Sequence, residues 1–225
     1  MKKQSTPTPV KPAKLSKKKE RRLEKELLVI LVFIGVLVGI FFLASWYFKS
    51  LHSFEYKGLA FSEERAGNIP IFHHSYFFKA FDGRLINYNL YIRTDPRTLD
   101  SIPVTGNKIS FSQQEVVFIS VNATGLQQCP YSPLAVASIS SYLADNQMKV
   151  KSGNLDFWDA GYKRQDYVNC DNQHGNKVIE ITTGNETKIT VNGKCYRIEI
   201  ADCQVLQGTE RFEVQAILDA QKVKV

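Results

Sequence analysis

An uncharged apolar run, LLVILVFIGVLVGIFFLASWYF at residues 27–48, limits most strongly what this chain can fold into. As an α-helix it would be about 33 Å long, close to the ~30 Å hydrocarbon thickness of a bilayer. A cleaved secretory signal usually has an apolar core of only ~7–15 residues. This run instead ends in Trp46 and Tyr47, whose amphipathic rings suit the level of the lipid headgroups. The sequence therefore predicts one transmembrane helix at 27–48, in a single-pass protein of the cell membrane.

The charge around this run predicts its orientation. Residues 1–26 contain ten Lys/Arg and three Glu, and their net charge of +7 equals that of the whole chain. Basic flanks stay on the cytoplasmic side of a membrane, so we expect a cytoplasmic tail at 1–26 and an extracytoplasmic domain at 54–225. The cations of the tail would attract anionic lipid headgroups. The domain has no excess positive charge, which argues against a nucleic-acid partner.

The polar domain at 54–225 has the mixed pattern of an α+β fold, built mainly on antiparallel sheet with one principal helix. Apolar and polar side chains alternate around the Asp-Gly pair at 82–83, and this pattern indicates a hairpin with a type I′ turn. Residues 115–121 are typical of a buried strand, residues 130–146 of a helix and residues 148–151 of a short strand. Strand, helix and strand in this order predict one parallel crossover unit.

A second hairpin is predicted around the Asn-Gly pair at 192–193. With a two-residue turn there, Val191 would pair with Lys194, and Ile189 with Tyr196. The core face of this hairpin would carry Ile189, Val191, Tyr196, Ile198 and Ile200.

Two further segments frame this hairpin. The Gly- and Asn-rich stretch at 152–176 is predicted to be a loop held down by Trp158 and Tyr162. At the C-terminal end, residues 210–220 show an alternation of apolar side chains that favours a strand over a short helix.

Four cysteines, Cys129, Cys170, Cys195 and Cys203, follow the apolar run, and none precedes it. Cysteines outside the cytoplasm are normally oxidised, so we expect up to two disulfides. We favour the pairs Cys129–Cys170 and Cys195–Cys203 among the three pairings. In one continuous strand, the eight residues from Cys195 to Cys203 would span ~26 Å, which is too far for a disulfide. The second pair therefore needs a chain reversal near residues 201–202. Zinc is the weaker alternative, since no Cys-x-x-Cys or Cys/His pair has ligand spacing, and we expect no metal and no cofactor.

Two kinds of short motif suggest modification and association. Asn122 and Asn185 begin the sequons NAT and NET, which predict a glycoprotein. Gly35 and Gly39 have the spacing that lets two membrane helices approach closely. We therefore expect weak self-association through the span, and either a homo-oligomer or another surface protein as the partner.

The order of several segments resembles a group of uncharacterised archaeal proteins with one N-terminal membrane span. The similar segments are FEYKGLAF, YNLYIRTDPR, CPYSPLAVASISSYL, DYVNC, VIEITTGNETKI, CYRIEI and DCQVLQGTERF. They cover nearly all of residues 54–213, and GNETKI, CY and TERF are the most specific of them. The resemblance implies an archaeal membrane protein with an outward-facing domain, and it implies no activity.

One stretch raises a catalytic alternative. A strand, a loop, Cys-Pro-Tyr-Ser and then a helix is similar to the thioredoxin and glutaredoxin arrangement, in which a helix N-terminus stabilises a thiolate. Cys129 has that position, whereas Ser132 stands in place of the second cysteine and the helix is not followed by a strand-opening proline. We therefore predict a membrane-anchored surface module for binding or assembly, with no catalytic residue. A membrane-tethered thiol oxidoreductase using Cys129 is the alternative.

The orientation leads to a labelling prediction. In intact cells, a membrane-impermeant thiol reagent should modify a cysteine introduced at Ser62 or Gln207, because the charge bias places both outside. A cysteine introduced at Thr6 should stay unmodified until the cells are permeabilised. Labelling of Thr6 without labelling of Gln207 would show that the charge argument is wrong.

Overall fold

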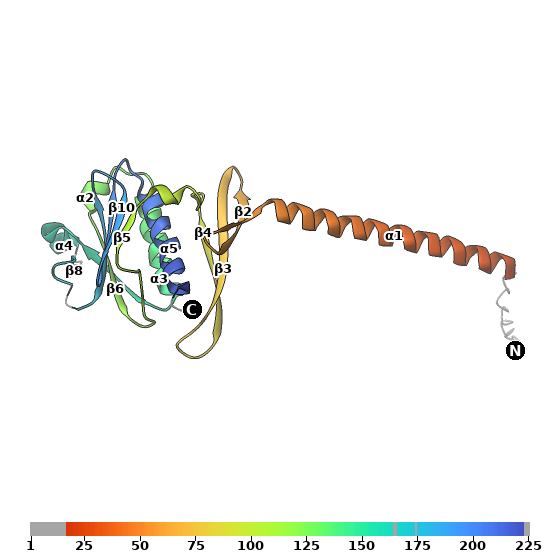
Figure 1. Cartoon of the computed structure of the whole chain (residues 1–225), viewed down its shortest axis with the longest axis horizontal. Helices are drawn as coiled ribbons and strands as arrows, with labels where there is room; N and C mark the ends of the chain where they lie inside the picture. The colour runs from red at the N-terminus through yellow and green to blue at the C-terminus, as the bar shows by residue number, and fades with distance from the viewer. Residues whose placement is uncertain (1–16, 164–165, 174, 223–225) are drawn as a thin grey trace, which may run out of the picture. The chain divides into compact units, whose positions relative to one another are not determined.

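The computed structural model describes residues 17–163, 166–173 and 175–222 (Figure 1). The chain divides into two units, residues 1–51 and 52–225. The part of the predicted tail at 1–16 lies outside the described residues.

The first unit is helix α1 (Lys17–Leu51). Within its stretch Lys25–Phe48, the most apolar 18 residues have a mean hydropathy of 3.3 and none of them is buried, and this stretch is the one membrane-spanning candidate within the described ranges. Such a helix suits a single-pass anchor or a signal anchor. Because α1 begins at Lys17, the basic residues directly before the apolar run belong to the same helix.

The second unit confirms the α+β class. Its first sheet is antiparallel throughout, in the order β1-β2-β3-β4. The strands are β1 (Ser53–Tyr56), β2 (Leu59–Ala66), β3 (Ile69–Lys79) and β4 (Leu85–Ile92). The predicted hairpin at 82–83 joins β3 to β4, and Gly83 has the positive φ (+86°) that favours glycine. Its connection is five residues long rather than two, since Lys79 and Leu85 are the last paired residues.

The second sheet is mixed, in the order β5-β10-β11-β9-β6-β7-β8. Its strands are β5 (Val104–Gly106), β6 (Val116–Val121), β7 (Lys149–Asn154), β8 (Asp166–Tyr167), β9 (Lys177–Thr183), β10 (Lys188–Asn192) and β11 (Cys195–Ile200). β10 and β11 form the antiparallel pair, and the other neighbouring strands described in this sheet run parallel. The predicted crossover is confirmed, because β6, a helix and β7 follow one another and the two strands pair in parallel.

The helices of this unit are η1 (Leu99–Ser101), α2 (Ala123–Leu126), α3 (Ser132–Asp145), α4 (Phe157–Lys163) and α5 (Val205–Gln221). The stretch predicted as a pinned loop contains α4, and Trp158 is 83% exposed, so its predicted anchoring role is wrong. The side chain of Tyr162 lies outside the described residues.

The β10–β11 hairpin forms with a corrected register. Val191 pairs with Tyr196 and Ile189 with Ile198, so the predicted pairing of Val191 with Lys194 is wrong by two residues. The turn is Gly193-Lys194, with Gly193 at φ +59°, which suits the first central position of a type II′ turn. A shift of two residues keeps every side chain on its face, and the five predicted core residues are all buried.

The strand favoured for residues 210–220 is a helix, α5. Phe212, Val214, Ala216 and Leu218 do alternate, but Glu213 and Ile217 between them are buried as well, and Gln215 is half-buried. A helix that is covered on all sides loses the one-sided 3.6-residue pattern by which a surface helix is recognised. The apparent period of two was therefore not a strand signal.

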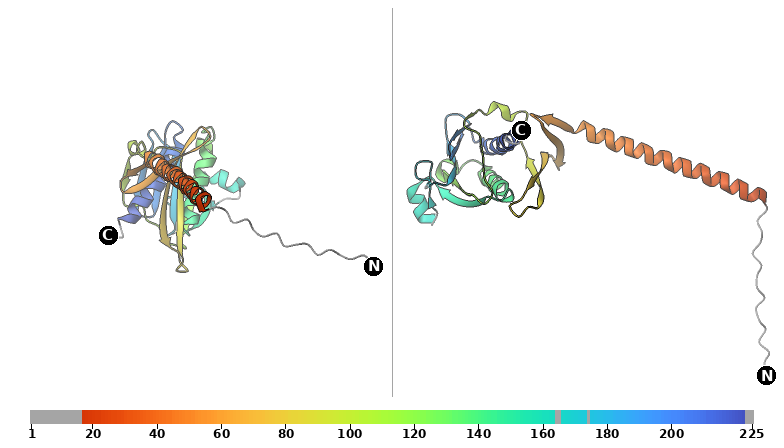
Figure 2. Two further views of the ribbon diagram at one scale, coloured as in Figure 1. Left: turned by 90° about the vertical axis from the view of Figure 1, so that its right-hand side faces the viewer. Right: turned by 60° about the horizontal axis from the view of Figure 1, so that its bottom comes forward.

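Helices α3 and α5 form a layer between the two sheets (Figures 1 and 2). On one side, Phe212 of α5 contacts the ring of Tyr196 on β11, with centroids 5.8 Å apart. On the other, Tyr142 of α3 contacts Tyr88 on β4 at 5.9 Å. One continuous cluster of buried apolar residues crosses all three layers, so the helices carry the core of the domain on both of their sides.

Candidate functional site

A cavity of about 610 Å³ opens where the helix layer meets the antiparallel sheet. Its walls come from β3, from the segment 108–113 and from the C-terminal ends of α3 and α5. The side chains that give it its character are Tyr76, Phe78, Phe111, Tyr142, Met148 and Ile217. This volume lies within the range of small-molecule sites, which are concave and mostly apolar.

The segment 108–113 is fixed by hydrogen bonds, so this wall is formed in advance. The backbone N–H of Ile109 donates to Asp219 Oδ2 at 2.9 Å. Two side chains donate to the carbonyl of Ser110, Tyr196 through its hydroxyl at 2.7 Å and Lys177 through Nζ. A wall that needs no ordering on binding lowers the entropic cost of holding a ligand.

Lys108 and Asp219 are the charged residues of the cavity lining, Lys108 being exposed, and the other polar groups there are neutral. The hydroxyl of Tyr76 donates to Asn146 Oδ1 at 2.7 Å. Burial raises the pKa of Tyr76 to about 12 and raises the pKa of Tyr142 well above its ordinary value. Both phenols therefore stay protonated at neutral pH, and Asp219 is already engaged by Ile109 and by Gln215 Nε2 at 2.9 Å. The arrangement suits an apolar or aromatic group held by burial and ring contacts.

One large apolar residue of the cavity lining, Phe77, is 61% exposed. Phe81 and Leu85, near the β3–β4 connection, are exposed as well but do not line the cavity.

The structure pairs Cys129 with Cys203 and Cys170 with Cys195, with Cα atoms 5.1 and 5.2 Å apart. The favoured pairing, Cys129–Cys170 and Cys195–Cys203, is therefore wrong. The chain does reverse after β11, where Asp202 and Cys203 adopt left-handed backbone angles. That reversal leads into α5 and brings Cys203 to the segment before α3 instead of back to Cys195.

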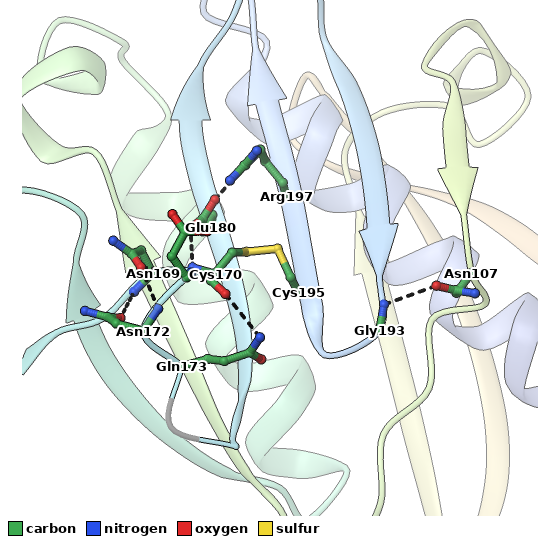
Figure 3. The surroundings of a disulfide bond; sticks show 10 residues. Asn107, Asn169, Cys170, Asn172, Gln173, Glu180, Gly193, Cys195 and Arg197 are labelled. Atoms are coloured by element: carbon green, nitrogen blue, oxygen red, sulfur yellow. Dashed lines mark hydrogen bonds and ion pairs between the residues drawn. A yellow bond between two sulfur atoms is a disulfide. The ribbon is translucent and has the colours of Figure 1, made fainter.

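The Cys170–Cys195 bond ties a loop to the sheet face that the helices leave uncovered (Figure 3). The backbone N–H of Cys170 donates to Glu180 Oε1 at 2.6 Å, and Arg197 Nε donates to Glu180 Oε2 at 2.6 Å. Gln173 Nε2 donates to the carbonyl of Cys170 at 3.1 Å. Cys195 lies on this face beside Arg197 (Figure 3), and its bond fastens the residues that precede β9.

Cys170, Glu180 and Cys195 also place three potential ligand atoms within 4.8 Å of one another. A cysteine binds a metal ion as the thiolate, and both sulfurs here are joined in a disulfide. Glu180 is engaged on both oxygens by Cys170 and Arg197. In this oxidised state the three residues hold the loop on the sheet and do not offer free metal ligands.

Cys129 lies three residues before the first residue of α3, the position on which the thiol alternative depends. It is 8% exposed and its sulfur is bonded to Cys203. Ser132, which stands in place of a second active-site cysteine, donates its hydroxyl to the carbonyl of Leu126 at 3.1 Å. A disulfide at this position fits either a structural bond or the oxidised form of a redox pair, and the two differ in how readily they are reduced.

The remaining predicted residues do not belong to the cavity lining. Asn122 is half-buried and caps α2 by accepting the N–H of Gly125 at 2.9 Å, whereas Asn185 is exposed in the β9–β10 turn. Of the two, Asn185 offers its side chain more freely to a modifying enzyme. Gly35 and Gly39 lie on α1 with open space around them.

Sequence reasoning missed the cavity. Its residues come from four segments that are far apart in the chain, and α5, which forms one wall, was expected to be a strand. The one available signal was the run of three consecutive aromatic residues, Tyr76, Phe77 and Phe78. Successive side chains of a strand point to opposite faces, so a single buried face does not require three aromatic residues in a row.

The disulfide assignment gives a chemical prediction. Non-reducing digestion of the folded protein should release the linked peptides Cys129–Cys203 and Cys170–Cys195. Iodoacetamide at neutral pH without denaturant should modify none of the four cysteines, because none is a free thiol. Rapid and selective modification of Cys129 would contradict the assignment and favour the redox alternative.

Comparison with known protein families, with curated proteins and with solved structures gives no match. What the chain does is therefore inferred from its own side chains and surfaces.

Proposed function

We propose that this chain is a membrane-anchored, outward-facing module that binds an apolar or aromatic group. The observation that supports this best is the preformed cavity of about 610 Å³ beneath β3, with its aromatic walls and a lining in which only Lys108 and Asp219 are charged. A site that offers apolar area and few charges gains its affinity from desolvation of the ligand. It has the character of a binding site more than of a catalytic one.

The cellular placement belongs to the same proposal. The basic residues before the apolar helix support a cytoplasmic N-terminus beside anionic lipid. Two disulfides support a domain in an oxidising compartment. The exposed Asn185 supports a glycoprotein, and the resemblance to archaeal proteins with one N-terminal membrane span supports an archaeal cell surface. Gly35 and Gly39 would allow the spans of two copies to approach each other.

The thiol oxidoreductase remains the second proposal, because Cys129 precedes a helix N-terminus and shares a disulfide with Cys203. After mild reduction, a redox cysteine in this position would form a thiolate of low pKa and react quickly with alkylating agents. A structural cysteine would stay oxidised under the same conditions, since structural disulfides resist mild reductants.

The binding proposal predicts specific photolabelling of the cavity. A small aryl diazirine, activated in the presence of the full chain in detergent, should label peptides that contain Tyr76–Phe78 and Ala216–Gln221. It should also label α1, which serves as an internal standard because its apolar side chains are exposed. Replacing Ala220, an exposed residue of the cavity wall, by Phe should reduce the cavity labelling several-fold by filling the space.

The matched control is Ala144→Phe, since Ala144 is exposed on α3 and does not line the cavity. This variant should keep the wild-type ratio of cavity label to α1 label. Equal labelling of the cavity peptides in wild type and in the Ala220→Phe variant would exclude the cavity as the binding site.

A further inference from the structure

The open edge of the antiparallel sheet is at β4. This strand is last in the order β1-β2-β3-β4, and among the described residues it pairs with β3 alone. It is eight residues long, Leu85–Ile92, with the sequence LINYNLYI.

The alternation of hydrogen bonds shows which backbone groups lie on the open side. Ala80 donates its N–H to the carbonyl of Arg84 directly beyond the last ladder pair, so that last pair, Lys79 with Leu85, is a non-hydrogen-bonded one. Bonded and non-bonded pairs alternate along an antiparallel ladder. The N–H and C=O groups of residues 85, 87, 89 and 91 therefore point away from β3, and no described residue hydrogen-bonds to them.

The other sheet edges carry the usual protection and β4 does not. The strands β1, β5 and β8 are four, three and two residues long, and short edge strands resist pairing with other chains. Charged side chains, proline and bulges serve the same purpose. The sequence of β4 has no charge and no proline, and its pairing with β3 runs without a bulge from Leu85 to Ile92.

We propose that β4 pairs antiparallel with β4 of a second copy of this chain, which joins the two four-stranded sheets into one. The proposal does not depend on the cavity function. A register centred on Tyr88 is self-complementary, since it places Asn87 opposite the partner's Asn89 and Leu85 opposite the partner's Tyr91. Both pairs lie on the exposed outer face, where cross-strand amide and apolar pairs stabilise a sheet.

A second copy suits this edge better than an unrelated peptide. The contact is isologous, so one strand supplies both halves and the assembly closes as a dimer. A membrane span would also hold two copies in the same plane, which raises their effective concentration and lets a modest interface suffice.

The test is the association of the full chain, measured by sedimentation in density-matched detergent. The double variant Asn87→Lys with Asn89→Lys places like charges opposite each other across the proposed interface. We expect the wild type to dimerise, and the double variant to have a dimer dissociation constant at least about tenfold higher. In hydrogen exchange by mass spectrometry, the peptide covering 85–92 should be protected in the wild type and exchange faster in the variant.

The charge-matched control is Ser62→Lys with Ser75→Lys. Ser75 is paired with Asn89, and both serines lie on inner strands of the same sheet. This control should dimerise like the wild type. The proposal is wrong if the wild type is monomeric, or if the variant of Asn87 and Asn89 associates as tightly as the wild type. It is also wrong if Gly35→Leu with Gly39→Leu alone abolishes the dimer, because the span would then hold it.

Discussion

The burial of α5 between two sheets is the constraint on which the rest of this domain depends. Thirteen of its residues are buried, including charged ones. A buried charge is costly unless hydrogen bonds compensate for the lost water, and α5 meets this requirement by binding loops. Glu210 accepts the N–H groups of Arg93 and Thr94, at 2.7 and 3.0 Å, and Asp219 accepts that of Ile109. The polar residues of the helix thus position the chain after β4 and before β6.

The cavity follows from the same arrangement. Both α3 and α5 end beside it, and Asp219 near the end of α5 holds the segment that forms its opposite wall. Gly208, nearer the start of α5, lets the helix pack closely on β11, because an added Cβ would lie 2.8 Å from Ile200 Cδ1. The binding site we propose is therefore built on rigid elements.

Short sequence patterns predicted those parts of the fold that depend only on residues close together in the chain. The apolar run at 27–48, the turn glycines Gly83 and Gly193, and the β6–α3–β7 crossover all follow from composition and period. The sequence patterns did not predict the path of α5, because a helix that is buried on nearly all sides has no amphipathic pattern to recognise. The disulfide pairing failed for the same reason, since only that path brings Cys203 to Cys129. The cavity needs both sheets and both helices, so no single stretch of sequence encodes it.

The pKa of the Glu213 carboxyl depends most directly on whether α5 is enclosed between the two sheets. It is fully buried, its Oε1 accepts the hydroxyl of Ser138 at 2.9 Å, and its Oε2 has no partner among the described residues. Burial, assisted by the nearby Glu210, raises the pKa of Glu213 from its ordinary 4.5 to about 8. The folded state therefore keeps a proton that the unfolded state loses near pH 4.5. The stability that this proton provides is complete below that pH and is lost as the pH rises towards 8.

The decisive measurement is the melting temperature of the full chain in non-ionic detergent between pH 5 and pH 9, for the wild type and for Glu213→Gln. Each unit of pKa difference is worth about 1.4 kcal/mol, so ionising Glu213 costs at most about 5 kcal/mol. The wild type should lose stability across this range. Glu213→Gln should be much less dependent on pH, while the exposed control Glu186→Gln should follow the wild type. If the wild type and Glu213→Gln show the same pH dependence, α5 is not enclosed between the two sheets.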